Sequence, residues 1–246
     1  MRILVKNKTW METASFSEAL ASLIKASTQI AVVGSGGKTS IIMRIAEEQK
    51  ALNKRVLVLT TTHMFTPERY GVFSGLAIDV ENALRAYNIA IVGKETDDGK
   101  ITWLGDELYQ EIAPMADIIL IEADGSKRLP LKFPNESEPV IPPYVDIILA
   151  VYGLSAIGRR GSDACHRWNL ARAALDISND DEIVKPEHMS LLMREAYLNP
   201  LNKKFPSAYV IPIFNQADNE ALVDIGEKII DELKPEMGIV SSILPL

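Results

Sequence analysis

A glycine-rich segment early in the sequence has the residue types that bind phosphate. It follows the apolar run Gln29–Val33 and reads Gly34-Ser35-Gly36-Gly37-Lys38-Thr39-Ser40. Glycines let the chain curl so that its N–H groups point inward at a helix N-terminus, which makes an anion site. Lys38 would then reach the terminal phosphates, and the Thr39 hydroxyl would ligate Mg²⁺. The sequence therefore predicts a phosphate-binding loop, or P-loop, for ATP or GTP with Mg²⁺.

The loop departs from the strict pattern G-x-x-x-x-G-K-S/T, because Val32 stands where that pattern has its first glycine. The segment G-x-x-G-K-T-S is shorter and closer to the phosphate loop of the Mur ligases. A glycine-rich turn without a ligand is the alternative. The Lys-Thr-Ser that follows the glycines disfavours it.

Two carboxylates, Glu122 and Asp124, close the apolar run Ile118–Ile121. Residues two apart project to the same side of a strand. At the carboxyl end of a parallel strand they would lie beside the P-loop, where a carboxylate holds Mg²⁺ directly or through water. We expect Glu122 to be the metal-side carboxylate, with Asp124 as a second ligand or a residue that positions water. Ordinary polar residues at a strand end are the alternative.

Hydroxyl and imidazole side chains at the end of the second strand, cations just after the two carboxylates, and a His-Arg pair further on are candidates for contact with the terminal phosphate, Mg²⁺ or a second substrate. Cations near a phosphate site neutralise developing charge or bind an anionic substrate. A solvated charged loop is the alternative. The candidates are Thr61, Thr62, His63, Lys127, Arg128, Lys132, His166 and Arg167.

A further strand candidate ends in Asn215-Gln216-Ala217-Asp218. The pattern is close to N-K-x-D, in which the Asp of GTPases accepts hydrogen bonds from guanine. Asn215 and Asp218 match the Asn and the hydrogen-bonding Asp of that pattern, but Gln216 replaces the lysine whose stem packs over the base. The sequence therefore predicts a small preference for GTP over ATP, with a plain turn after the strand as the alternative.

The elements that must position these residues alternate between strands and helices. The strand candidates are near-continuous Val, Ile and Leu, which is typical of a parallel sheet covered on both faces. Helical patterns span Ser15–Lys25, Thr39–Leu52 and Asn219–Leu233. This alternation predicts an α/β fold, a three-layer P-loop NTPase-like domain with a mostly parallel sheet. The strands are expected at Gln29–Val33, Arg55–Thr61, Ile89–Val92, Ile118–Glu122, Val145–Tyr152, Tyr209–Phe214 and Ile239–Ile243.

The 246 residues are expected to form a single domain, 1–246, with a small helical subdomain at about 164–201. Residues 129–144 hold five of the 13 prolines, and proline-dense chain sustains neither helix nor central strand. A long ordered loop or flap is predicted there.

Composition excludes several classes of protein. Hydrophobic residues make up 47% and charged residues 24%, as in globular proteins, so disorder and coiled coils are excluded. The net charge of −7 disfavours binding to nucleic acid or to an anionic membrane. Cys165, the one cysteine, excludes a disulfide framework. With no apolar run of membrane-spanning length and no secretory signal, a soluble cytoplasmic protein is expected.

Taken together, these motifs resemble the YqeC family. The most specific part is Glu122-Ala123-Asp124-Gly125-Ser126, which runs into Leu129-Pro130-Leu131-Lys132 and then Glu138-Pro139-Val140-Ile141-Pro142. The sequence departs from the family at Gln216, where members carry Lys, and at Ser137, where a His is expected. The resemblance implies an accessory protein for the maturation of selenium-dependent molybdenum hydroxylases. A molybdenum hydroxylase or its cofactor-maturation proteins are the partners that it implies.

Three functions remain open from the sequence. The first is a nucleotide-hydrolysing accessory protein whose Pro-rich loop or helical region changes conformation. The second is a Mur-like ligase or a kinase that transfers phosphoryl to an anionic acceptor. The third is a scaffold in which nucleotide only stabilises the fold.

Overall fold

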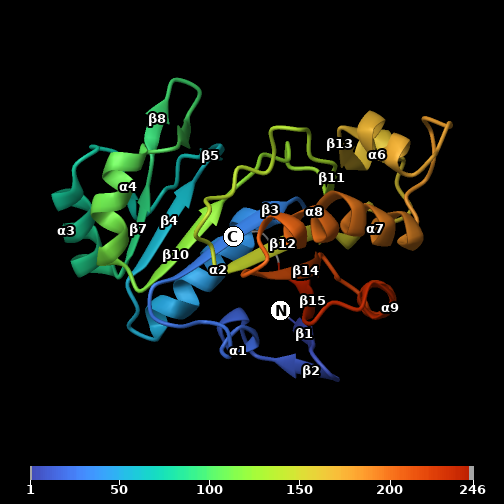
Figure 1. Ribbon diagram of the computed structural model, residues 1–246, viewed down its shortest axis with the longest axis horizontal. Helices are drawn as coiled ribbons and strands as arrows, with labels where there is room; N and C mark the ends of the chain where they lie inside the picture. Colours follow the sequence, from blue (N-terminus) through green and yellow to red (C-terminus); the bar gives the residue numbers. More distant parts are fainter. Residues whose placement is uncertain (1, 244–246) are drawn as a thin grey trace.

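The computed structural model describes residues 2–243, and one large sheet runs through the centre of the molecule (Figure 1). Its strands are β1 (Arg2–Lys6), β2 (Trp10–Thr13), β3 (Thr28–Gly34), β4 (Val56–Thr60), β6 (Gly71–Val72), β7 (Ile89–Val92), β10 (Ile118–Glu122), β12 (Ile147–Gly153), β14 (Tyr209–Asn215) and β15 (Gly238–Ser242). They lie in the order β2-β1-β15-β14-β12-β3-β10-β4-β7-β6. All neighbouring pairs are parallel except β1 with β15 and β1 with β2.

Two small sheets lie outside the large one. The first pairs β11 (Leu131–Lys132) with β13 (Cys165–His166), and the second consists of β5 (His63–Phe65), β9 (Lys100–Thr102) and β8 (Lys94–Thr96). The α-helices are α1 (Phe16–Ala19), α2 (Lys38–Ala51), α3 (Ala77–Tyr87), α4 (Asp106–Ile112), α5 (Gly161–Ala164), α6 (Trp168–Ala174), α7 (Pro186–Met193), α8 (Asn199–Lys204) and α9 (Glu220–Leu233). Short 3₁₀ turns form η1 (Ala113–Met115) and η2 (Leu154–Ala156), and a π-helical turn, η3 (Arg194–Leu198), joins α7 to α8.

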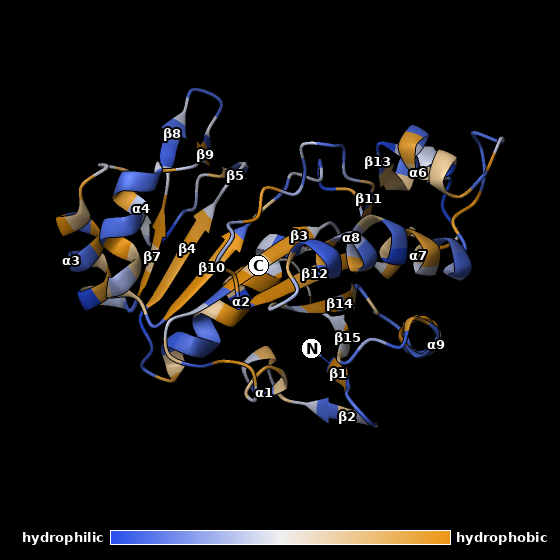
Figure 2. Ribbon diagram, viewed as in Figure 1, coloured by the Kyte–Doolittle hydropathy of each residue, from blue (hydrophilic) through white to orange (hydrophobic). Residues whose placement is uncertain are grey.

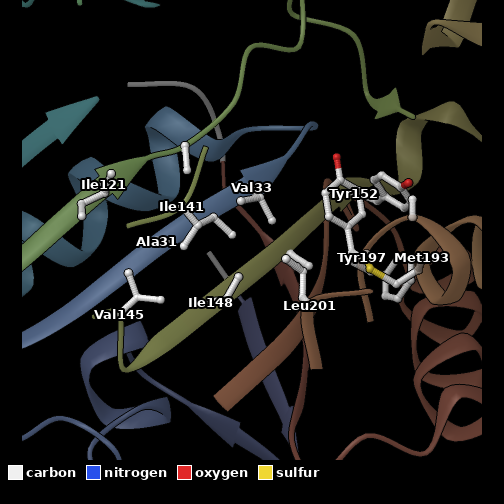
Figure 3. Close-up of a cluster of buried hydrophobic side chains, with 14 of the residues drawn as sticks. Ala31, Val33, Ile121, Ile141, Val145, Ile148, Tyr152, Met193, Tyr197 and Leu201 are labelled. Carbon is white, nitrogen blue, oxygen red and sulfur yellow. The ribbon is translucent and has the colours of Figure 1, made fainter. Parts of the chain in front are cut away.

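Apolar side chains cover both faces of the central strands. In β3, Ile30 and Val32 pack into one buried cluster with residues of α1 and α2. Their neighbours Ala31 and Val33 face the other way, into a second cluster that includes residues of α3, α4, α7 and α9. Part of the second cluster is drawn in Figure 3, and the apolar character of β4, β10 and β12 is visible in Figure 2. This pattern confirms the predicted α/β fold, with helices on both faces of a mostly parallel sheet.

The seven predicted strands are β3, β4, β7, β10, β12, β14 and β15, and two predicted helices are α2 and α9. Asn219 caps α9, since its side chain accepts a hydrogen bond from the Leu222 N–H at 3.0 Å. The helix predicted over Ser15–Lys25 is shorter. After α1 the chain turns, and the N–H groups of Leu23 and Ile24 both donate to Leu20 O.

The predicted helical region contains α6, α7, η3 and α8, and the last of these helices ends at Lys204. The Pro-rich segment 129–144 contains β11 and is otherwise without regular structure, as predicted. No helix within residues 2–243 is long and apolar enough to cross a membrane.

Candidate phosphate-binding site

The glycine loop joins β3 to α2, so that the N-terminus of α2 faces the carboxyl ends of the central strands. At Gly36 the φ angle is +77°, and a Cβ atom there would lie 2.2 Å from the backbone N of Gly153. At Gly37 the φ angle is +116°, and a Cβ would lie 2.6 Å from Asn215 Nδ2. Only glycine meets both requirements, because it adopts positive φ freely and has no side chain to clash.

Lys38 opens α2 and is folded back onto the loop. Its Nζ donates to Gly34 O at 2.8 Å and lies 3.2 Å from Asp124 Oδ1 and 3.9 Å from Glu122 Oε1. The side chain is 2% exposed. The cation therefore lies beside the loop, with two carboxylates close to it.

Thr39 and Glu122 meet across the gap between α2 and β10. The Thr39 hydroxyl donates to Glu122 Oε2 at 2.7 Å. Because β10 is the direct neighbour of β3, with Glu122 opposite Val32, the carboxylate reaches the first turn of the helix. Burial raises the pKa of Glu122, while Lys38 and the Thr39 hydroxyl act in the opposite direction.

This pair fits a Mg²⁺ ion that is bound together with phosphate. Mg²⁺ takes oxygen ligands and commonly binds through one or two protein groups plus substrate phosphates and water. Thr39 supplies a hydroxyl and Glu122 a carboxylate. Residues 2–243 contain no group of three or more His, Cys, Asp or Glu side chains that could hold a metal by themselves. A cation here would depend on phosphate oxygens for its remaining ligands.

Asp124 lies where all of its hydrogen-bonding capacity is used by the protein. Its carboxylate accepts the Gly34 N–H at 2.9 Å and the Tyr197 hydroxyl at 3.3 Å. It also pairs with Lys38 at 3.2 Å and with Lys132 at 3.1 Å, and it is fully buried. This geometry disfavours the second metal ligand or water-positioning residue expected from the sequence. It makes Asp124 a residue that holds the P-loop in place.

The ion pairs continue from Asp124 into the Pro-rich segment. Lys132 Nζ lies 2.7 Å from Glu138 Oε2, and Arg167 Nη1 lies 2.6 Å from the same oxygen. Burial acts to raise the pKa of Glu138, but the two cations outweigh burial and lower it. Lys132 and Arg167 are therefore satisfied within the protein, which disfavours the expected contact of either with a second substrate.

A cavity of about 800 Å³ opens in front of Thr39 and Glu122. Of the expected second-site residues, His63, Lys127, Arg128 and His166 line it, together with Ser40 from the P-loop. Thr61 and Thr62 do not. The Thr61 hydroxyl donates to Val140 O at 2.6 Å, and the Thr62 hydroxyl is buried with no hydrogen-bond partner among residues 2–243.

Sequence reasoning missed Phe65 and Lys100, which also line the cavity. Both belong to the small sheet of β5, β9 and β8, and Lys100 follows the turn at Asp98-Gly99. An Asp-Gly pair between short extended segments is a hairpin signal. That signal could have predicted the hairpin, but not its position beside the cavity.

Asn215 and Asp218 have different positions. Asn215 is buried, and its Nδ2 donates to Gly36 O at 2.8 Å while its Oδ1 accepts from Ser241 Oγ at 3.0 Å. Asp218 is exposed, and its Oδ1 accepts from Ser242 Oγ at 2.7 Å. Asn215 therefore supports the P-loop from the β14 side, and Asp218 leaves a carboxylate at the surface.

This chain is similar to known proteins in sequence and, at a distance, in structure. The family described as "YqeC protein" matches residues 30–169, which include the P-loop, Glu122 and the Pro-rich segment. A protein of Escherichia coli (strain K12), named "Uncharacterized protein YqeC", is 38% identical over 152 residues. The aligned part is 59% of this chain and 59% of that relative, less than two thirds of its length. The crystal structure of a GTPase in apo form from Pyrococcus abyssi is similar at a TM-score of 0.34 and 11% identity, over 82% of this chain and 73% of that chain. That similarity is too distant to bear on function.

Proposed function

We propose that this chain, which belongs to the YqeC family, is a nucleoside triphosphate-binding protein that uses Mg²⁺ and hydrolyses its nucleotide. The observation that carries the proposal is the 2.7 Å contact between the Thr39 hydroxyl and Glu122, directly after the glycine loop. A hydroxyl in the first turn of a helix and a carboxylate on the neighbouring strand are the protein ligands that a phosphate-bound Mg²⁺ requires.

Different residues of the loop would have different roles in nucleotide binding. The first N–H groups of α2 and the helix dipole favour a phosphate at Gly37–Ser40. Lys38 would exchange its contact with Gly34 O for a phosphate oxygen, since both are hydrogen-bond acceptors. When bound, Mg²⁺ would neutralise charge on the terminal phosphates. Asp124 and Asn215 would hold the loop in the binding conformation from its two sides.

The proposed nucleotide is GTP, with a small margin over ATP. Asp218 is exposed at the end of β14, beyond Asn215, and a carboxylate there can accept two guanine N–H groups that adenine does not offer. Gln216 lacks the lysine stem of N-K-x-D, and the short loop resembles that of ATP-binding ligases. These features oppose each other, so the expected discrimination is small.

The setting that the family resemblance implies forms part of the proposal. The protein would act as an accessory in the maturation of selenium-dependent molybdenum hydroxylases, in contact with such an enzyme or with its cofactor-maturation proteins. Co-purification of a molybdenum hydroxylase with the tagged protein would test this. Absence of such an enzyme under crosslinking would count against it.

A second candidate function is phosphoryl transfer to an anionic acceptor, as in a Mur-like ligase or a kinase. The cavity beside Thr39 and Glu122 favours it, since a plain hydrolase needs room only for water. Turnover that depends on an added acceptor would identify a transferase. Turnover without one would identify a hydrolase.

The experiment is a titration with fluorescent GTP, ATP and CTP, with and without Mg²⁺, together with a measurement of phosphate release. We expect binding that Mg²⁺ strengthens and a preference for GTP that Asp218→Asn removes. Glu47→Gln, on the outer part of α2, is the control and should bind as the wild type does. ATP binding at least tenfold tighter than GTP, unchanged by Asp218→Asn, would remove the base-reading role. No binding of any of the three nucleotides would overturn the proposed function.

A further inference from the structure

The cavity beside the Thr39–Glu122 pair contains cations that the protein does not neutralise. Of its two carboxylates, Glu138 is occupied by Lys132 and Arg167, and Glu122 lies 3.9 Å from Lys38 Nζ. Within the described residues, Lys127 and Arg128 take part in no ion pair, and both are exposed. Lys100, on β9, is a third cation at the cavity and pairs with Asp98.

The backbone around these cations is held in an uncommon conformation. Lys127 and Arg128 have φ angles of +50° and +60°, in the left-handed region that side-chain-bearing residues rarely adopt. The Leu129 N–H donates to Ser126 O at 3.1 Å and closes the turn. The Arg128 guanidinium lies over the Phe65 ring, 4.2 Å from its centroid. Uncommon backbone conformations of this kind gather at functional sites.

With nucleotide bound as proposed, the cavity would lie beside its terminal phosphate. Thr39 and Glu122, the residues that would hold Mg²⁺, line the cavity, and a bound Mg²⁺ would neutralise charge on the terminal phosphates. Asp218, the proposed base-reading residue, follows β14, which lies two strands from β3 on one side of the sheet. Glu122 is on β10, the neighbour of β3 on the other side. A nucleotide bound between them would direct its base away from the cavity.

We propose that this cavity binds a second substrate, a small organic anion with a phosphate or carboxylate group. Its anionic group would lie between Lys127, Arg128 and Lys100, and its apolar part against Phe65, Met43 and Met64. The anion would then lie beside the terminal phosphate of the nucleotide. This site rests on the proposed function for its place next to a nucleotide, but its own charges do not depend on it.

His166, on the cavity wall, reports on the same charges. Burial lowers its pKa, and the cations Arg167, Lys127 and Lys132 lower it further, while Glu138 acts in the opposite direction. An anion bound among these cations would offset their effect and raise the pKa of His166. His188, on α7, also has a lowered pKa but does not line the cavity, so it is an internal control.

The test uses phenyl phosphate as the probe, with the P-loop saturated by a non-hydrolysable GTP analogue and Mg²⁺. Calorimetry should show one phenyl phosphate per chain, with affinity at least tenfold lower in Arg128→Ala and in Lys127→Ala. Lys94→Ala, an exposed lysine on β8 outside the cavity, is the matched control and should leave the affinity unchanged. NMR titration should show that phenyl phosphate raises the pKa of His166 and leaves the pKa of His188 unchanged.

The outcomes separate this site from the proposed function. Equal affinity in wild type and both variants, or loss of the probe when nucleotide is added, would overturn the anion site. If the protein binds no nucleotide at all, the proposed function fails, and the anion site is then tested alone. In that case phenyl phosphate should still raise the pKa of His166, both in the wild type and in Lys38→Ala. An unmoved His166 would overturn the site.

Discussion

Lys38 combines two roles at the scale of single residues. It is the proposed phosphate cation, and it also neutralises a fully buried carboxylate, Asp124. Removal of Lys38 would leave that carboxylate with Lys132 as its remaining cation. The structure indicates a cost, because a buried charge that loses one of its partners destabilises the folded state.

Lys38→Ala should therefore abolish nucleotide binding and lower the free energy of unfolding by about 2 kcal/mol. The cost stays moderate because Asp124 keeps Lys132 and the Gly34 N–H as partners. Fluorescent-nucleotide titration and urea unfolding measure the two effects. Lys54→Ala, an exposed lysine just beyond α2, is the control. Wild-type nucleotide affinity in Lys38→Ala would show that the loop does not bind phosphate.

Glu122→Gln should remove the Mg²⁺ dependence of nucleotide binding and leave Mg²⁺-independent affinity close to that of the wild type. The amide keeps the shape of the carboxylate but not the charge that attracts the metal. In the wild type, burial raises the pKa of Glu122, so the carboxyl takes up a proton at higher pH than an ordinary Glu. Mg²⁺-dependent affinity should then fall as pH falls through that raised pKa.

Titrations with and without Mg²⁺ between about pH 5 and 8 would measure this dependence. The pH dependence should be absent in Glu122→Gln. An equal loss of affinity with and without Mg²⁺ would mean that the substitution damages the loop and that Glu122 is not a metal-side residue.

At the scale of elements, the turn from β3 into α2 depends on close approach to β12. Gly36 has φ +77° and touches the backbone of Gly153, whereas Gly158 has φ +79° with open space around its Cβ position. Alanine at either site carries the strain of positive φ, about 1 kcal/mol. Gly36→Ala adds a clash with backbone that cannot move aside.

Gly158→Ala should accordingly lower stability by about 1 kcal/mol and leave nucleotide binding intact. Gly36→Ala should cost about 3 kcal/mol or more and abolish binding, because the loop must move off β12. Urea unfolding and nucleotide titration measure both variants. Gly158→Ala reports backbone strain alone, and Gly36→Ala reports strain together with the clash against β12. Equal losses of stability would show that the close approach of the loop to β12 does not affect the free energy of unfolding.

Element prediction succeeded where burial on both faces leaves a strong pattern, as in β10 and β12. It failed for strands that form only because a strand distant in the sequence pairs with them. β1 and β2 form an antiparallel edge only because β15, from the other end of the chain, lies beside β1. At the site, Lys38, Thr39 and Glu122 were expected together from motif and strand order. The burial of Asp124 and Lys132 could not be predicted, since it depends on the path of the Pro-rich segment and on Tyr197 from η3.

At the scale of the whole molecule, one chain of ion pairs crosses from the P-loop to the helical region. Asp124 pairs with Lys132, Lys132 with Glu138, and Glu138 with Arg167, which precedes α6. Tyr197 donates to Asp124 and Tyr152 to the Lys132 carbonyl, and the two tyrosine side chains lie together in Figure 3. Movement of the Pro-rich segment would therefore change the support of the P-loop and of α6 at once.

Glu138→Gln tests this connection through its dependence on pH. The pKa of Glu138 is lowered in the folded state, so its charge stabilises the fold at pH values above the pKa of an unfolded Glu, about 4.3. That contribution is lost as pH falls through the lowered pKa. Glu138→Gln should be less stable than the wild type at about pH 7 and 5, and the difference should shrink at about pH 3.5.

Urea midpoints at the three pH values measure the difference, with Glu136→Gln, exposed on the same segment, as the control. The control should follow the wild type throughout, because its carboxylate has no ion pair among residues 2–243 to lose. If Glu138→Gln differed from the wild type equally at all three pH values, the stabilisation would come from shape and not from charge. The ion-pair chain would then not couple the P-loop to the helical region through Glu138.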